Sequence, residues 1–231
     1  MEQDEIFAHT LFQLGPFAIR DTVVTTWVVM LGLWLACWYL GHRIQSSPGL
    51  LQTAAEGIVT TIEDAVRQVL PRQASMVLPF IMTLWIFLVV ANLVGLIPGL
   101  HSPTRDPSAT AALAVLVFLS VHWFGIRAQG LPDYLRHYLS PTPILLPFHI
   151  ISEITRTLAL AVRLFGNMMS LELVALLLVW VAGLLVPIPI LMLHIVEALV
   201  QAYIFGMLAL IYIASAIQTK ARAPEEDGPT I

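Results

Sequence analysis

Apolar residues along the chain are grouped in long runs that predict helices crossing a membrane. A helix rises ~1.5 Å per residue, so roughly 20 apolar residues span the ~30 Å hydrocarbon layer of a bilayer. Three runs are suited to a single crossing, at residues 23–40, 76–97 and 109–124. Two longer runs, residues 145–186 and 188–217, follow near the end of the chain. The pattern predicts about five crossings.

Residues 48–70 have a different pattern, with apolar side chains every three or four positions. Ser47 and Pro48 mark a helix start, because a hydroxyl caps free N–H groups and proline fits the first turn. Charged residues such as Glu56 and Glu63 occupy the other side. The segment is predicted to be an amphipathic helix that lies along the membrane surface or docks onto a partner's helix.

The two long runs decide the predicted architecture. A continuous helix of about 40 residues is roughly 60 Å long, twice the hydrocarbon thickness. Such a helix cannot stand upright: either it breaks, or it lies steeply tilted. Pro187 and Pro189 provide a turn between the runs. The predicted fold class is an all-α membrane protein with about five membrane helices and one surface helix, the last two helices forming a long, steeply tilted antiparallel hairpin.

The composition excludes a soluble domain. Hydrophobic residues make up 58% of the chain and charged residues 11%, with a mean hydropathy of +0.84, whereas about a quarter of a soluble domain is charged. The net charge of −4 gives no support for nucleic-acid binding. A single cysteine, Cys37, excludes an intrachain disulfide and a cysteine-based metal site. No metal or cofactor is predicted.

Basic residues in the loops predict the orientation. If the chain crosses five times, residues 1–22 form an external loop or surface-lying helix, and residues 218–231 form a cytoplasmic tail. The basic residues on the cytoplasmic side would be Arg43, Arg67, Arg72, Arg127, Arg136, Lys220 and Arg222. The external side has only Arg20 and Arg105. This asymmetry predicts an external N-terminus and a cytoplasmic C-terminus.

Charged residues interrupt the first long run and mark a candidate site. At about 100° per residue, one narrow stripe contains Arg156, Arg163, Asn167 and Ser170. Glu172 points roughly the other way. An arginine at the centre of a membrane helix costs roughly 2.5–3.5 kcal/mol, so it normally faces a partner or a water-filled cavity. Arg163 has no neutralising residue within reach on its stripe, which makes it the leading functional residue.

The other polar residues of the two long runs allow more than one interpretation. Glu153 lies one turn before Arg156, and this pair is predicted to be structural. The second run carries His194, Glu197 and Gln201. His194 and Gln201 share a face, with Glu197 one turn from each. A proton or ion path between the helices is one interpretation, and polar contacts that hold packed helices together are the other.

Two segments of the long runs carry a resemblance to a known family. RLFGNM at residues 163–168, followed by Glu172, and HIVEALVQAYIFGMLALIYI at residues 194–213 resemble subunit a of the rotary F-type ATP synthase. The likeness extends to the early span, the surface helix and the short hairpin whose loop contains PTRDPSAT. The two-part signature on consecutive apolar runs is highly specific.

The resemblance implies a stator subunit whose two long helices lie tilted against a rotating ring of c subunits, each with a mid-membrane carboxylate. Arg163 would be the essential arginine that faces this ring. Because a guanidinium stays protonated, it would attract a deprotonated ring carboxylate and separate two aqueous half-channels. The polar neighbours at the interface with the ring would be Asn167, Gln201 and Ser170.

The resemblance also implies an ion half-channel on the external side, lined by Glu172 and His194. Glu197 would relay protons there or act as the counter-ion of His194. The implied partners are the c-subunit ring, peripheral-stalk b subunits, the rest of the ATP synthase complex and membrane lipid. The implied location is the bacterial inner membrane, with no catalytic ATP site on this chain. The coupling ion, H⁺ or Na⁺, stays open, because the ring site lies on another chain.

Three positions depart from the family pattern: Thr157, Leu171 and Glu197. Many relatives have proline at the position of Thr157, so a kink there is not expected in this chain. Two other functions were weighed, an ion-coupled secondary transporter and a passive membrane assembly subunit. A transporter usually shows internal repeats, and none is visible here. A passive assembly subunit would not need an arginine such as Arg163 on a stripe that has no counter-ion in its own chain.

Overall fold

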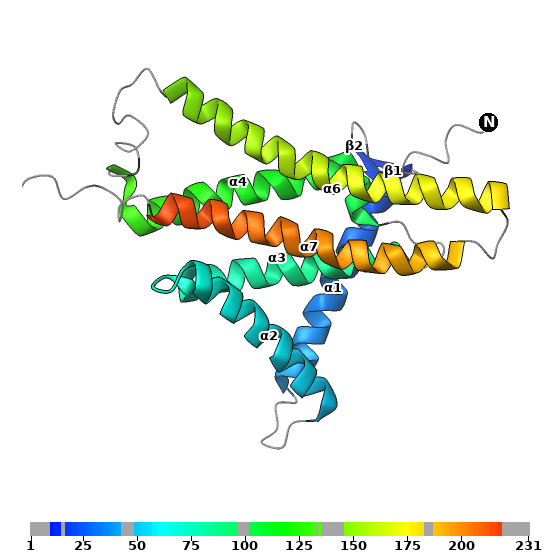
Figure 1. Ribbon diagram of the computed structural model, residues 1–231, viewed down its shortest axis with the longest axis horizontal. Coiled ribbons are helices and arrows are strands. Elements are labelled where there is room, and N and C mark those ends of the chain that lie inside the picture. The colour runs from blue at the N-terminus through cyan, green and yellow to red at the C-terminus, as the bar shows by residue number, and fades with distance from the viewer. Residues whose placement is uncertain are drawn as a thin grey trace, which may run out of the picture.

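The computed structural model describes residues 10–14, 17–42, 49–96, 102–132, 134, 146–182 and 187–218, and helices dominate this part of the chain (Figure 1). In chain order the elements are β1 (Thr10–Leu14), β2 (Phe17–Arg20), α1 (Asp21–His42), α2 (Leu50–Val69), α3 (Ala74–Val94), the 3₁₀ helix η1 (Pro103–Arg105), α4 (Pro107–Gln129), α6 (Leu146–Ala182) and α7 (Pro187–Gln218). The predicted helical membrane fold is confirmed for these residues. The predicted tail beyond Gln218 lies outside them.

Four helical segments in the described part are long and apolar enough to cross a membrane: Thr22–His42, Ala74–Val94, Pro107–Gln129 and Met192–Gln218. Helix α6 has 37 residues, which corresponds to roughly 56 Å, but it is not among the four. The fifth crossing, the steep tilt of the last two helices and the surface position of α2 therefore stay predictions.

The N-terminal segment contains a β-hairpin, which differs from the predicted loop or surface-lying helix. Strands β1 and β2 pair antiparallel, with Thr10 opposite Arg20 and Leu14 opposite Phe17. The two strands contain Thr, Leu, Phe and Ile, which favour extended backbone, and a Gly-Pro dipeptide stands between them in the sequence. That dipeptide is a turn signal. It separates two segments too short to show helical periodicity.

The apolar core lies where α3, α4, α6 and α7 meet. Helices α6 and α7 contact each other and run in opposite directions, and α4 contacts both (Figure 1). Side chains with at most 1% exposure come from all four helices, among them Leu88, Val117, Leu164 and Phe205. Helix α6 contributes one buried row, Leu160, Leu164 and Met168, spaced by four positions as one face of a helix requires. One face of α6 therefore holds it in the bundle.

Helices α1 and α2 extend away from this bundle (Figure 1). In α1, burial is confined to its first turns, at Thr22, Thr25 and Val29. In α2, the buried residues are Ile62 and Val66 near its end. Only the end of the apolar face of α2 therefore packs against the bundle.

Helices α3 and α7 approach closely at Gly206. A Cβ atom there would lie closer than 3.0 Å to the indole of Trp85, and this indole stacks on the Tyr203 ring with centroids 5.9 Å apart. The Trp85 Nε1–H donates to the Tyr203 carbonyl oxygen at 3.3 Å. Further along α3, Asn92 Nδ2 donates to the Ala198 carbonyl oxygen at 3.2 Å. These contacts fix the register of α7 against α3.

Gly206→Ala is expected to destabilise the protein by about 1–3 kcal/mol, because the added methyl group overpacks the contact with Trp85. Thermal unfolding of the purified protein in detergent should show a lower midpoint. Gly32→Ala in α1, where a Cβ would meet nothing within 4 Å, is the matched control and should keep or raise the midpoint, because alanine favours a helix over glycine. The loss should be smaller in a Trp85→Leu background, and an equal loss in both backgrounds would contradict the contact.

Candidate functional site

The exposed face of α6 carries polar residues within an apolar surface. Arg156, Arg163 and Ser170 recur every seven positions and are all exposed, while Leu158 and Val162 beside them are 61% and 59% exposed. Within the described part of the chain, the Arg163 guanidinium has no ion-pair or hydrogen-bond partner. A cation on an apolar surface is unfavourable unless water or a counter-ion reaches it. Arg163 therefore needs a partner outside the described residues.

One hydrogen bond joins α6 and α7 one turn beyond Arg163. Asn167 Nδ2 donates to Gln201 Oε1 at 2.7 Å, so the structure brings together two of the predicted interface residues. Gln201 is only 1% exposed, and its Nε2 has no partner among the described residues. The Gln201 oxygen thus accepts a hydrogen bond from α6, and the Gln201 nitrogen remains a buried donor. Its predicted contact with the ring stays a prediction.

The predicted channel residues His194 and Glu197 lie one turn apart on α7, and both are half-buried. His194 Nε2 is enclosed and has no partner within the part that the structure describes. Buried polar atoms are normally hydrogen-bonded, so this nitrogen marks a position for water or another polar group. The backbone of Glu172 belongs to α6, but its side chain lies outside the described residues.

A buried polar cluster adjoins α7 close to these residues. Asn92, which donates to the Ala198 carbonyl, also accepts a hydrogen bond from Thr104 Oγ1 at 2.9 Å. Ser102 Oγ lies 2.6 Å from Thr104 Oγ1 and donates to the Ala91 carbonyl oxygen. Asn92 and Thr104 are fully buried. Sequence reasoning missed Asn92, although an amide inside an apolar run is a signal for a polar contact between helices.

Asp106 extends this cluster to α1 and starts α4. Its Oδ1 accepts from the Ser108 backbone N–H at 2.9 Å, as an N-cap does, and its Oδ2 accepts from Thr22 Oγ1 at 3.0 Å. Asp106 is 3% exposed. The loop containing PTRDPSAT therefore has a structural role, since it ties the starts of α1 and α4 together next to α7.

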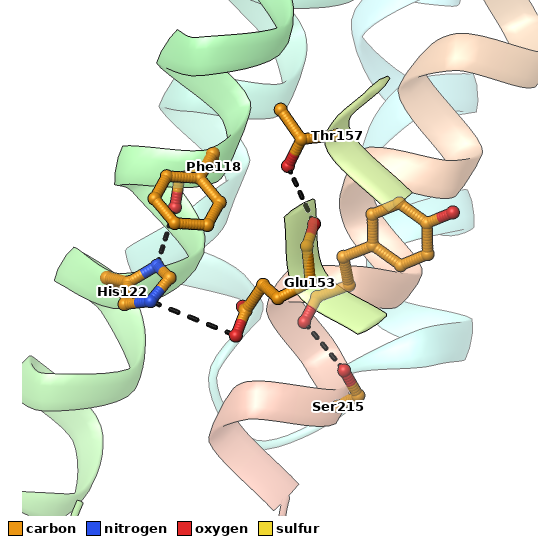
Figure 2. Close-up of polar contacts among 6 residues, drawn as sticks. Phe118, His122, Glu153, Thr157 and Ser215 are labelled. Carbon is orange, nitrogen blue, oxygen red and sulfur yellow. Dashed lines mark hydrogen bonds and ion pairs between the residues drawn. The ribbon is translucent and has the colours of Figure 1, made fainter. Parts of the chain in front are cut away.

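A second polar group lies at the other end of α6 (Figure 2). Glu153 is directed toward His122 of α4, with 3.9 Å between Glu153 Oε2 and His122 Nε2. The Arg156 guanidinium carbon lies 5.2 Å from the ring centroid of Tyr212 on α7, within the range of a cation–π contact. The predicted pairing of Glu153 with Arg156 stays a prediction. His122 was not identified from the sequence.

Fold and site together define the class of the protein. It is an integral membrane protein with several long apolar helices, an exposed arginine that has no counter-ion among the described residues, and buried polar atoms between helices. Ionisable and polar groups at such depth are a property of proteins that move ions through membranes.

The chain belongs to the ATP synthase A chain family, whose sequence model matches residues 23–214. It is 65% identical over 221 residues to ATP synthase subunit a 2 of Pelobacter propionicus, covering 95% of this chain and 97% of that one. ATP synthase subunit a of Legionella pneumophila is 56% identical over 219 residues, with 94% and 95% coverage. A Bradyrhizobium ATP synthase subunit a 2 is 47% identical over 222 residues, with 96% and 100% coverage.

These comparisons confirm the resemblance seen in the two signature segments. The chain is a subunit of the F-type ATP synthase membrane sector and a multi-pass protein of a bacterial inner membrane. The other classes weighed from the sequence, a secondary transporter and a passive assembly subunit, find no support in these matches.

Gln201→Leu is expected to lower stability by about 1–3 kcal/mol, because the Asn167 amide loses its acceptor in a partly buried position. Removing both partners, by Asn167→Leu with Gln201→Leu, should be less destabilising than the sum of the single changes. Thermal unfolding in detergent measures each value, with Gln68→Leu at an exposed position of α2 as control. Strictly additive losses would show that the hydrogen bond does not contribute.

Proposed function

We propose that the chain is the ion-conducting stator subunit of the rotary sector, passing H⁺ or Na⁺ to and from carboxylates on a rotating ring of c subunits. Two aqueous half-channels, one open to each side of the membrane, would meet the ring on either side of Arg163. An ion would then cross only by travelling with the ring. Ion flow would in this way be coupled to rotation, and through rotation to ATP synthesis or hydrolysis.

The observation that carries this proposal is the exposed Arg163, which has no counter-ion in the described part of its own chain. A guanidinium stays protonated in proteins. It would attract a deprotonated carboxylate from another chain and displace its ion, and it cannot carry the proton itself. Exposed apolar side chains such as Leu158 of α6 and Val200 of α7, 61% and 49% exposed, would supply the surface on which apolar ring helices pack.

The external half-channel is proposed to run past His194, Glu197 and Glu172. Two buried nitrogen atoms support this path, His194 Nε2 and, seven positions later on α7, Gln201 Nε2. Water in a channel would supply the partners that these atoms lack among the described residues. The polar cluster around Asn92 lies against α7 between them, at Ala198, and would add hydroxyl and amide groups to the same region.

The remaining partners and the orientation follow from the same proposal. Peripheral-stalk b subunits would hold the chain against the torque of the ring. The excess of basic residues on one side would place the C-terminus in the cytoplasm and the N-terminal hairpin outside.

Arg163→Ala is expected to abolish ATP-driven ion transport in inverted vesicles while the complex still assembles, since both the barrier and the attraction for the ring carboxylate are lost. Arg163→Lys should also fail, because an ammonium group can release its proton in a low-dielectric site. Arg67→Ala, at an exposed ion pair with Glu63, is the control and should transport ions normally. Wild-type transport by Arg163→Ala would refute the proposal.

Cysteines at Glu172 and His194 are expected to react with small water-soluble thiol reagents in membranes, because water fills the proposed half-channel. A cysteine at Leu177, which is 63% exposed on α6, should stay unreactive because its surroundings are lipid. The exposed Cys37 must first be replaced by serine, and mass spectrometry then measures labelling. If the cysteines at positions 172 and 194 both stay unreactive, Glu172 and His194 are contacts between packed helices and not part of a channel.

A further inference from the structure

His122 of α4 and Glu153 of α6 form an ionisable pair that the site around Arg163 does not include. Their side chains are 30% and 19% exposed, and 3.9 Å separates His122 Nε2 from Glu153 Oε2 (Figure 2). Arg163 follows Glu153 by ten positions, which corresponds to roughly 15 Å along the axis of α6. In the proposed orientation the pair lies on the cytoplasmic side of Arg163, opposite to His194.

The hydrogen bonds of His122 determine what its second nitrogen can do. Nδ1 lies 2.9 Å from the Phe118 carbonyl oxygen, and a carbonyl oxygen only accepts, so Nδ1 carries a hydrogen and donates. In a neutral imidazole Nε2 is then an acceptor. It faces Glu153 Oε2, which is also an acceptor when the carboxyl is ionised. The two atoms attract each other only when one proton is present on His122 or on Glu153.

The separation of the two atoms also matters. A distance of 3.9 Å exceeds that of a direct N–H···O bond, ~2.7–3.2 Å, and suits a contact in which a water bridges the two groups. With one bound proton the pair has no net charge, either as imidazolium and carboxylate or as imidazole and carboxylic acid. Without that proton it has a net negative charge, which is unfavourable among apolar helices.

We propose that His122 and Glu153 together bind one exchangeable proton and pass protons between cytoplasmic water and the ring side of α6. A proton leaving a ring carboxyl would be taken up at Nε2, giving imidazolium beside carboxylate. Its release to cytoplasmic water would restore the Nε2 lone pair, and the reverse sequence would load the ring. This inference rests on the proposed function and assigns a proton site to its cytoplasmic half-channel.

Aromatic, hydroxyl and charged groups from three helices and Tyr134 stand around the pair. Tyr134 packs edge-on against His122, with ring centroids 6.1 Å apart. Arg156, one turn after Glu153, lies over the Tyr212 ring of α7. From α7, Ser215 Oγ donates to the Tyr212 carbonyl oxygen at 2.8 Å (Figure 2). In the sequence of these two helices, Arg127 follows His122 by five positions and His149 precedes Glu153 by four.

The test uses the complete ATP synthase in sealed vesicles and compares two double variants. His122→Gln with Glu153→Gln keeps polar groups at both positions but cannot bind a proton. His122→Glu with Glu153→His exchanges the two groups and keeps the proton site. ATP-driven proton uptake should fall by about tenfold in the amide pair and recover in the exchanged pair, with equal amounts of assembled complex in the membrane.

A second readout separates proton binding from a structural contact. Passive proton flux through the membrane sector, measured after removal of the catalytic sector, should depend less steeply on cytoplasmic pH in the amide pair than in the wild type. Thr155→Val, on the exposed face of α6, is the control and should match the wild type in both measurements. Should the amide pair fail to assemble, His122→Gln alone serves for the same comparison.

Several outcomes would overturn the inference. Wild-type flux and wild-type pH dependence in the amide pair would make His122 and Glu153 a structural contact, as would an exchanged pair that transports no better than the amide pair. A wild-type complex that carries Na⁺ and no protons would also exclude a proton site. If Arg163→Ala blocks transport in the same vesicles while the amide pair does not lower it, the inference fails and the proposed function stands. If neither change affects transport, both fail.

Discussion

An exposed guanidinium on an apolar helix, with no counter-ion in the described part of its own chain, is the constraint on which the rest of this structure depends. Arg163 can be tolerated in a membrane only if a carboxylate or water reaches it from outside that part. Helix α6 is built accordingly. It is held in the bundle by one buried row, Leu160, Leu164 and Met168, and its opposite face is exposed. A helix so placed leaves its arginine accessible to water or to a carboxylate from outside the described residues.

The position of α7 beside this arginine is fixed by polar contacts as much as by apolar packing. Trp85 and Asn92 of α3 donate to backbone carbonyls of α7, and Gly206 allows the indole to approach. Lipid offers no competing hydrogen bonds, so such contacts are selective for one register. Gln201 both holds two helices together and keeps a polar atom that a proposed ion path could use. Its oxygen accepts from Asn167, while its buried nitrogen keeps a hydrogen to donate.

Length and hydropathy were sufficient to predict the helices, because the thickness of a bilayer selects for apolar runs of a narrow range of lengths. The exposed stripe with Arg163 followed from helical periodicity alone. Partners between helices could not be predicted in the same way. Glu153 faces His122 of α4, a neighbour that the sequence did not identify, because the rotation and register of packed helices decide which side chains meet. The N-terminal hairpin was missed because its two strands, of five and four residues, are too short to show a clear period, and only the Gly-Pro turn signal pointed to it.

The spacing of the carboxylates along α6 determines which role Arg163 can have. Glu153 precedes Arg163 by ten positions and Glu172 follows it by nine, so the two backbone positions stand roughly 15 Å on either side along the helix axis. For Glu153, that spacing is too long for its carboxylate to neutralise the guanidinium directly, and it is too long for a proton to cross without intermediates. In the proposed function each carboxylate would serve its own side of the membrane, and the permanent positive charge between them would repel a cation that passes directly. In the proposed function, a ring that carries its own carboxylates past Arg163 would be the connection between the two sides.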